Sequence, residues 1–557
     1  MGFFDWRSSS VPPNTSRPSP ELSSTSSDSK VGLHNPDRPT TPSIFKLPPE
    51  IVQFILSFLD VQHLQSVYRT CHEFKAHIED DQLWLPLLKA SLPDHDIPQT
   101  PSPALSYRQL YLSQHPYWFL PRQRIWFSDD AYNGKLIVAK FNPTTGTISG
   151  YRLAAERPEA QPQTWIVKPS VIIHHVNPRV YVSTDDPVLS LTYSNDLFYS
   201  NGSASRSWDP GSEVRMRVGR PEQKINASLM LSKDLPDSTA NTPNVVVWPP
   251  RTIPDMPRTR SSTGNNSSNS FMSKGHKPTT LDEISKTTFR LRTWSHFTQG
   301  MLNLGVRIGE EVSTWSTLDP TLYTPTRQKP YQGLYVGDYA AHGCEFLLVL
   351  QTEQAPRYQR QFLNADNDGG DDEGGTARRR NYISAVLAAL RERQFMDEDE
   401  AGMDHGYGSE DGAAGQLHAR QTIDGAHARF PTPGSVTPNV EDPEGNIHKG
   451  AIEAIKITGD VNVPRGEHTF IADDIGPDGT IRIAHEPPFR GARVVKSRGH
   501  VAARGFRDDE FIPSQLFLIS PDLMAQYWLP FGHISFYKRI DVKELLRGTV
   551  VQRRASE

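Results

Sequence analysis

The part of this 557-residue chain that most limits its fold is residues 44–60, with the sequence IFKLPPEIVQFILSFLD. Two prolines precede an almost uncharged run, and proline suits the first turn of a helix because its missing N–H would be unpaired there anyway. A helix that begins near Pro49 would be apolar on nearly every face, so it must be buried or span a membrane. The run ends at Asp60 and is too short to cross a bilayer. We therefore expect protein to cover this helix.

The surrounding residues 43–90 are predicted to form a compact helical unit. Asp60 is a suitable N-cap for a second helix that runs to Cys71. A third apolar group follows, made of Phe74, Ile78, Leu83, Trp84, Leu87 and Leu88. Residues 91–120 are expected to be a helical linker, with one more helix over 104–120 that ends before Pro116.

Low-complexity composition marks the segments that we expect to lie outside any core. Ser, Pro and Thr dominate the N-terminal tail, residues 1–42, and Ser, Asn and Thr dominate residues 252–286. Residues 352–450 contain an acidic tract followed by three arginines. Such segments bury too little apolar surface to offset their ordering entropy, so we predict disorder in all three. Within the last, Ile383, Val386, Leu387 and Leu390 share one helical face, which fits either a transient helix or a docking helix.

Elsewhere the pattern changes to short apolar stretches separated by Gly, Pro and Asn turns. They recur at 135–141, 164–167, 179–182, 188–191, 244–248, 289–294, 345–350, 452–458, 480–483, 515–519 and 533–537. This pattern predicts a mostly antiparallel, barrel-like β-domain in two parts, 121–351 and 451–545, followed by a tail at 546–557. The expected fold class is therefore a multidomain α+β chain.

Several classes of function are disfavoured. The formal net charge of −5 argues against a nucleic-acid surface. Two cysteines favour a reducing compartment, the cytoplasm or nucleus, and the N-terminus has no signal-peptide pattern, so we expect no membrane association. His72 and His77 are five residues apart, whereas a zinc protease motif needs four. We expect no catalytic residues, metal or cofactor.

The helical unit follows the pattern L-P-x-E-I, I-L-S-F-L, L-x-x-V-x-x-T-C, F and L-W, which resembles the F-box. The matching residues are Leu47, Pro48, Glu50, Ile51, Ile55, Leu56, Leu59, Leu64, Val67, Thr70, Cys71, Phe74, Leu83 and Trp84. The resemblance implies that part of the apolar surface binds the SKP adaptor of a cullin-RING ubiquitin ligase. The candidate adaptor contacts are Leu47, Pro48, Glu50, Ile51, Ile55, Leu59, Leu64, Val67, Cys71 and Trp84. The alternative is a self-contained helical core.

Residues 331–346 and 455–467 each read as a strand that enters a Gly-rich turn bearing polar side chains, as at a recognition pocket in a barrel mouth. Together with a weaker match at 499–506, they resemble the F-box only protein 31 family. The matching residues are Gly333, Leu334, Gly337, Tyr339, His342, Gly343, Glu345, residues 456–460, Asn462, Pro464 and Gly466. The resemblance implies a β-domain that binds D-type cyclins and proteins with a C-terminal amide.

The candidate substrate-binding residues are His342, Gly343, Thr458, Gly459, Asp460 and Asn462. An amide offers N–H donors without charge, so a carboxylate such as Asp460 would favour it and repel an ordinary C-terminus. The alternatives are that Asp460 caps its own turn and that His342 is a satisfied turn histidine.

The predicted function is that of a substrate-recognition subunit of an SKP–cullin–F-box (SCF) ligase. Its partners would be the SKP adaptor, the cullin scaffold and substrates that are cyclin-like or C-terminally modified. The alternatives are a scaffold that acts outside a ligase, a β-barrel that binds a small ligand, and an enzymatic barrel.

Overall fold

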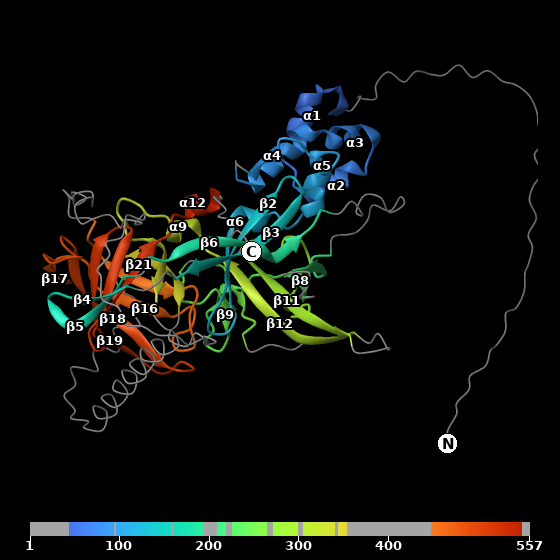
Figure 1. The fold of residues 1–557 in the computed structure, drawn as a ribbon. Helices are drawn as coiled ribbons and strands as arrows, with labels where there is room; N and C mark the ends of the chain where they lie inside the picture. Colours follow the sequence, from blue (N-terminus) through green and yellow to red (C-terminus); the bar gives the residue numbers. More distant parts are fainter. Residues whose placement is uncertain are drawn as a thin grey trace, which may run out of the picture. The chain divides into compact units, whose positions relative to one another are not determined.

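The computed structural model describes residues 44–93, 96–157, 161–175, 177–193, 209–218, 225–254, 256–263, 271–298, 305–339, 343–353 and 447–547. The chain divides into two compact units, Met1–Ile78 and Glu79–Glu557, and each is described by itself (Figure 1). The N-terminal tail, the helix considered at 383–390 and nearly all of 352–450 lie outside the described residues. Among the described residues, no helix is long and apolar enough to cross a membrane.

The first unit consists of short helices. They are the 3-10 helix η1 (Ile44–Lys46) and the α-helices α1 (Pro49–Leu56), α2 (Val61–Tyr68) and α3 (His72–Glu79). Proline stands at the start of α1, as predicted. Asp60 caps α2 by accepting a hydrogen bond from His63 N at 2.9 Å, also as predicted. The buried side chains are Val52, Leu56, Val61, Leu64 and Ile78.

The second unit begins with the helices α4 (Asp81–Ser91), α5 (Tyr107–Gln114) and α6 (Phe119–Gln123). Tyr107 N donates to Asp81 Oδ1 at 2.8 Å, and the rings of Trp84 and Tyr111 lie 5.8 Å apart, so α4 and α5 are joined. The helix predicted over 104–120 thus exists as α5, which ends before Pro116. Gln114 Nε2 donates to Gly146 O at 2.7 Å and links α5 to the sheet that follows.

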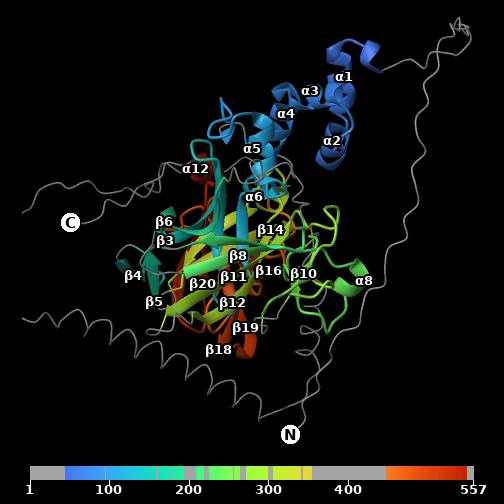
Figure 2. The ribbon, with the colours of Figure 1, turned by 90° about the vertical axis from the view of Figure 1, so that its right-hand side faces the viewer.

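That sheet has eight strands in the order β6-β3-β2-β1-β12-β11-β8-β7. Figure 2 labels β3, β6, β8, β11 and β12 of this sheet. Its strands are β1 (Ile125–Ser128), β2 (Leu136–Asn142), β3 (Thr147–Glu156), β6 (Arg179–Leu191), β7 (Glu213–Arg217), β8 (Ile225–Leu231), β11 (Thr288–Thr298) and β12 (Gly305–Thr317). Two apolar stretches expected at 179–182 and 188–191 form the single strand β6, which bulges where it pairs with β3.

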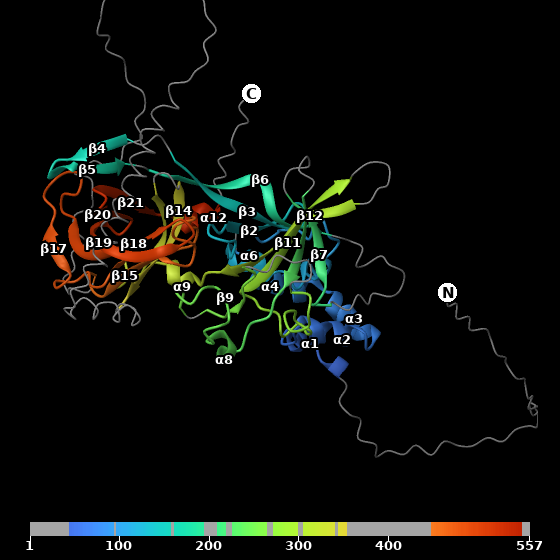
Figure 3. The same ribbon diagram turned by 90° about the horizontal axis from the view of Figure 1, so that it is seen from below.

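The other sheet has the barrel-like architecture that was predicted, and the structure shows that it closes. Eight strands follow one another in the order β13-β14-β15-β16-β18-β19-β20-β21, and Tyr335 of β13 pairs with Arg539 of β21 to close the ring. These strands are β13 (Gly333–Asp338), β14 (Cys344–Thr352), β15 (Ala451–Lys456), β16 (His468–Ala472), β18 (Arg493–Ala503), β19 (Arg507–Ser520), β20 (Leu523–Trp528) and β21 (His533–Arg539). Outside the barrel, β17 (Thr480–Ile483) pairs with β18, while β5 (Lys168–His175) and β4 (Gln161–Trp165) extend from β21 (Figure 3).

Alternation along the barrel strands separates two cores. One side chain set faces the barrel interior and includes Tyr335, Leu347, Ala454, Phe470 and Tyr537. The opposite set, which includes Val336, Leu348 and Ile455, faces outward and packs with Phe127 and Leu136 of the eight-stranded sheet. The short helices α9 (Pro320–Tyr323) and α12 (Val542–Arg547) add Leu322 and Leu545 to this second core.

Much of residues 252–286 belongs to the fold, so the prediction of disorder there was wrong for the described part. β9 (Val247–Trp248) pairs with β10 (Thr259–Arg260). Buried Asp129 accepts from Ser261 Oγ at 2.6 Å, from Ser262 Oγ at 2.7 Å and from Thr314 N at 2.7 Å. The polar composition suggested a solvated loop, but these hydroxyl groups satisfy a buried carboxylate instead.

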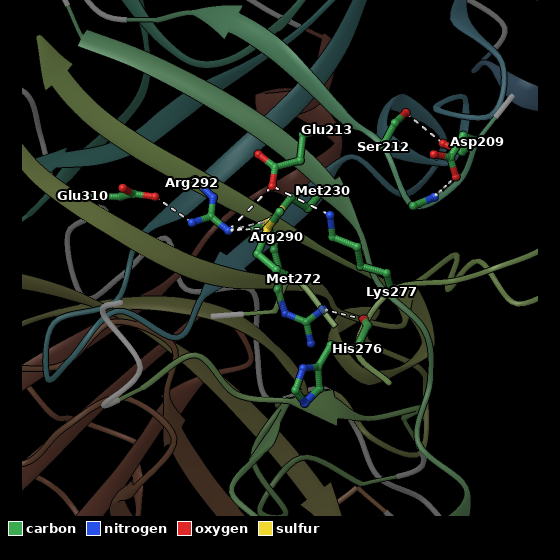
Figure 4. Close-up of polar contacts among 11 residues, drawn as sticks. Asp209, Ser212, Glu213, Met230, Met272, His276, Lys277, Arg290, Arg292 and Glu310 are labelled. Carbon is green, nitrogen blue, oxygen red and sulfur yellow. Dashed lines mark hydrogen bonds and ion pairs between the residues drawn. The ribbon is translucent and has the colours of Figure 1, made fainter. Parts of the chain in front are cut away.

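Two buried arginines of β11 fasten the same segment to the sheet (Figure 4). Arg290 donates to Thr259 Oγ1 at 2.9 Å, and its guanidinium carbon lies 4.1 Å from the ring centroid of Phe271. Arg292 contacts Met272 of the segment, with its Nη2 3.2 Å from the sulfur, and it lies between carboxylates, 2.6 Å from Glu310 and 3.6 Å from Glu213. The guanidinium groups thus hold segments that are far apart in the sequence.

Candidate protein-binding surfaces

One apolar surface lies on and beside α1. Phe45, Leu47, Ile51, Phe54, Ile55 and Phe58 are all exposed, and we call these six residues the α1 face. Phe58 is 74% exposed and Phe54 61%, and their rings meet edge to face at 4.9 Å. Large apolar side chains that gather at the surface mark a protein-binding site.

The predicted adaptor contacts differ in exposure. Leu47, Pro48, Glu50, Ile51 and Ile55 are exposed, and Leu59, Val67 and Cys71 are half-buried. Leu64 and Trp84 are fully buried and present no surface to a partner in this structure. The candidate set omitted Phe54 and Phe58, the most exposed members of the α1 face. Their signal was available, because both were among the apolar residues that make this helix apolar all round.

A second candidate surface is the end of the barrel at which β13–β14, β15–β16, β18–β19 and β20–β21 are connected. We call this end the barrel mouth. Lys456, the last residue of β15, lies there with its Nζ 2.8 Å from Glu345 Oε2 of β14 and 2.8 Å from Asp460 Oδ2 of the following turn. Its Nζ is also 4.6 Å from the ring centroid of Tyr339. Lys456, Glu345 and Asp460 are each more than nine-tenths buried.

The electrostatics of this cluster follow from its burial. Loss of hydration raises the pKa of Glu345 to about 8, the nearby Asp460 adds to the rise, and Lys456 opposes it. At neutral pH Glu345 is therefore largely protonated. The cluster then holds one ammonium group and one carboxylate, and Lys456 donates its hydrogen bond to Asp460.

The turn of residues 457–467 carries most of the predicted substrate-binding residues. Asp460 Oδ1 accepts from Asn462 N at 2.6 Å and from Val463 N at 3.0 Å, so Asp460 does cap its own turn. Thr458 Oγ1 accepts from Phe346 N at 2.9 Å. Gly459 has no room for a side chain, because a Cβ would lie 2.4 Å from Arg465 N.

Of the three remaining predicted residues, the structure describes Asn462 and Gly343. Asn462 Nδ2 donates to Ala502 O at 2.9 Å, which ties the turn to the β18–β19 hairpin. Gly343 has a φ of +83°, the left-handed region that favours glycine, and its carbonyl accepts from Tyr339 N at 2.9 Å. His342 lies outside the described residues.

Sequence reasoning did not propose Lys456, Glu345 or Tyr339 as site residues. Lys456 carried a signal, since it continues the inward alternation of Ile452 and Ala454 and so places a charge inside the barrel. A hydroxyl and amide chain lies nearby: Tyr537 donates to Gln526 Oε1 at 3.0 Å, and Gln526 donates to Ser514 Oγ at 3.1 Å. In the described part of the chain, no group of three or more His, Cys, Asp or Glu residues could hold a metal ion.

Comparison with protein families gives two matches. A model described as F-box-like matches residues 44–87, and a model described as Cyclin D1 binding domain matches residues 315–544. The chain is an F-box protein with a cyclin D1 binding domain. No curated protein matches it. The first match in this F-box protein contains all six residues of the α1 face. The second contains every strand of the barrel but only the end of β12 from the eight-stranded sheet.

Proposed function

We propose that this F-box protein is the substrate-recognition subunit of an SCF ubiquitin ligase. The observation that carries the proposal is the α1 face, because six large apolar side chains are exposed on residues that the F-box-like model matches. Burying such a patch against the SKP adaptor removes apolar surface from water and so drives association. Buried Val52 and Leu56 hold the same helix to its own unit.

In this proposal the chain itself makes and breaks no bond. The adaptor and cullin bring a ubiquitin-charged enzyme close to a substrate held at the barrel mouth, and the gain is one of effective concentration. The two cysteines, Cys71 and Cys344, are free thiols, which supports action in the cytoplasm or nucleus. The barrel interior is filled by side chains such as Phe470 and Tyr537, so it offers little support for a small-ligand barrel.

The chemistry of the mouth favours substrates whose terminus is uncharged. With Glu345 protonated, the Lys456 ammonium is balanced by Asp460, and no net positive charge is left to attract a carboxylate. An amide N–H could share the Asp460 carboxylate with Lys456, whereas a terminal carboxylate would be repelled by it. Cyclin-like or C-terminally modified proteins are the substrate classes that we propose.

The test is adaptor binding by the full chain. Ile51→Ala/Phe54→Ala shortens two exposed side chains of the α1 face, and Ile166→Ala/Val167→Ala is the matched control because it also shortens two exposed apolar side chains. We expect the first variant to raise the Kd for a purified SKP adaptor by about a hundredfold, as for interface anchors, and to lose cullin in a pull-down. The control should bind like the wild type. Equal affinity of all three proteins would overturn the proposal.

A further inference from the structure

The turn that carries Asp460 is held by a loop from the eight-stranded sheet. Gly459 N donates to Asn133 O at 2.8 Å, and Arg465 N donates to Tyr132 O at 2.9 Å, so the loop bonds both sides of the base of the turn. This loop, residues 129–135, connects β1 to β2 and lies outside the residues that the cyclin D1 binding model matches.

Tyr132 has an unusual backbone in this loop. Its φ is +60°, a left-handed conformation that is rare for an aromatic residue, and Asn133 N donates to Ala131 O at 2.7 Å across it. The loop is braced around this strain, because Lys135 pairs with Asp130 at 2.9 Å. Tyr132 is 41% exposed in this conformation. A strained residue that holds an aromatic ring out toward solvent beside a binding site points to function.

The tip of the turn is also held by a segment that contains residues with positive φ. Val461 is 36% exposed, and its carbonyl accepts from Gly505 N of the β18–β19 hairpin at 2.7 Å. Phe506 and Asp508 of that hairpin also have positive φ, at 54° and 50°. Three of the five non-glycine residues with positive φ in the described part of the chain thus lie in the two loops that hold this turn.

We propose that Tyr132 and Val461 form an apolar rim of the substrate site and select an apolar side chain close to the substrate's terminus. The inference rests on the proposed function, since it assumes that the terminus lies at Lys456 and Asp460. An extended peptide rises by about 3.3 Å per residue. The residues that precede the substrate's C-terminus would therefore pass the turn that bears Val461 and contacts Tyr132. Tyrosine offers a large contact area at low entropic cost and is enriched among the anchors of interfaces.

The substrate site is therefore built from two sheets. Residues 456–467 of the barrel supply the polar groups, among them Lys456 and Asp460, and the β1–β2 loop supplies the aromatic ring of Tyr132. A barrel without the eight-stranded sheet would lack Tyr132 and the two hydrogen bonds that its loop accepts from the turn.

The experiment uses the full chain and two peptide libraries, one with free C-terminal carboxylates and one with C-terminal amides, each randomised at the residues before the terminus. Tyr132→Asn removes the ring but suits a left-handed backbone. Tyr132→Phe keeps the ring, and Leu105→Ala is a control at another exposed apolar residue. Val461→Ser tests the second rim residue without involving the Tyr132 backbone.

We expect the wild type, Tyr132→Phe and Leu105→Ala to enrich apolar residues next to the terminus. Tyr132→Asn and Val461→Ser should enrich apolar residues about tenfold less than the wild type does. Both variants should keep the wild type's preference between terminal amide and terminal carboxylate, and its thermal stability. If the wild type selects peptides and both rim variants give the same profile, the inference is wrong but the substrate site stands. If the wild type selects no peptide from either library, the proposed substrate site and the rim fall together.

Discussion

The Nζ of Lys456 lies 2.8 Å from Oδ2 of Asp460, and both side chains are buried at the barrel mouth. A buried ion pair compensates the cost of removing two charges from water only while both partners remain. Glu345, 2.8 Å from the same ammonium, is the third member of the cluster and provides a carboxyl group that can ionise when Asp460 is changed. The three residues are expected to respond to substitution as a unit.

Replacing Asp460 tests this coupling. Asp460→Asn keeps an oxygen that can cap the turn but removes the charge that pairs with Lys456, so we expect the free energy of unfolding to fall by about 1–3 kcal/mol. The pKa of Glu345 should fall as well, because Asp460 contributes to its rise. Urea unfolding measures the stability. Asp473→Asn, which breaks an ion pair to Arg498 on a more exposed carboxylate, should change it by less than about 0.5 kcal/mol.

The pH dependence of stability has a definite sign for Glu345. Its pKa is raised from 4.5 to about 8 in the folded chain, so the folded state binds this proton more tightly than the unfolded state does. The stabilisation is complete below the unfolded pKa and is lost as the pH rises toward the folded pKa. Between about pH 5 and pH 8 the wild type should lose stability relative to Glu345→Gln, with no further change above that window. Parallel curves from urea unfolding across this range would show that Glu345 is ionised at neutral pH.

Gly459 can be tested by adding one methyl group. Gly459→Ala would bring a Cβ within 2.4 Å of Arg465 N, and a backbone atom cannot move aside without shifting the turn. We expect a loss of about 2 kcal/mol in the free energy of unfolding together with weaker substrate capture. Gly275→Ala is the matched control, since its nearest neighbour would be 3.6 Å away. Equal stability of the two variants would contradict the tight turn.

The parts of the fold that sequence reasoning predicted correctly depend on local rules. The start of α1 at Pro49 and the cap at Asp60 follow from which residues suit the first turn of a helix. Short apolar stretches bounded by turn residues identified strands such as β14 and β15, although the order of the strands around the barrel does not follow from local pattern. In the site, Asp460 and its turn were found because glycine and aspartate mark turns, but the pairing of Lys456 with Glu345 requires knowing that β14 and β15 are neighbours.

The segment 252–286 shows why composition misled. Its serines and threonines resemble those of a disordered linker, yet Ser261 and Ser262 satisfy Asp129, which comes from the end of β1. Asp129→Ala should leave these hydroxyl groups and Thr314 N without their acceptor and lower the free energy of unfolding by about 2–4 kcal/mol. Limited proteolysis should then cut near residues 256–263, where the wild type resists. Unchanged cleavage would mean that the segment is held by Arg290 and Arg292 instead.

The two sides of α1 are predicted to have separable roles. Val52 is 1% exposed and Phe58 is 74% exposed, although they lie on or beside the same helix. Val52→Ala should lower the free energy of unfolding by about 1–2 kcal/mol through lost packing, with adaptor affinity changed only as far as the helix loosens. Phe58→Ala should leave the thermal midpoint unchanged and weaken adaptor binding, because its ring contributes to the α1 face rather than to the core. Thermal unfolding and calorimetric titration with the adaptor separate these effects. A Phe58→Ala protein that unfolds earlier but binds normally would place this ring in the helical core and remove it from the binding surface.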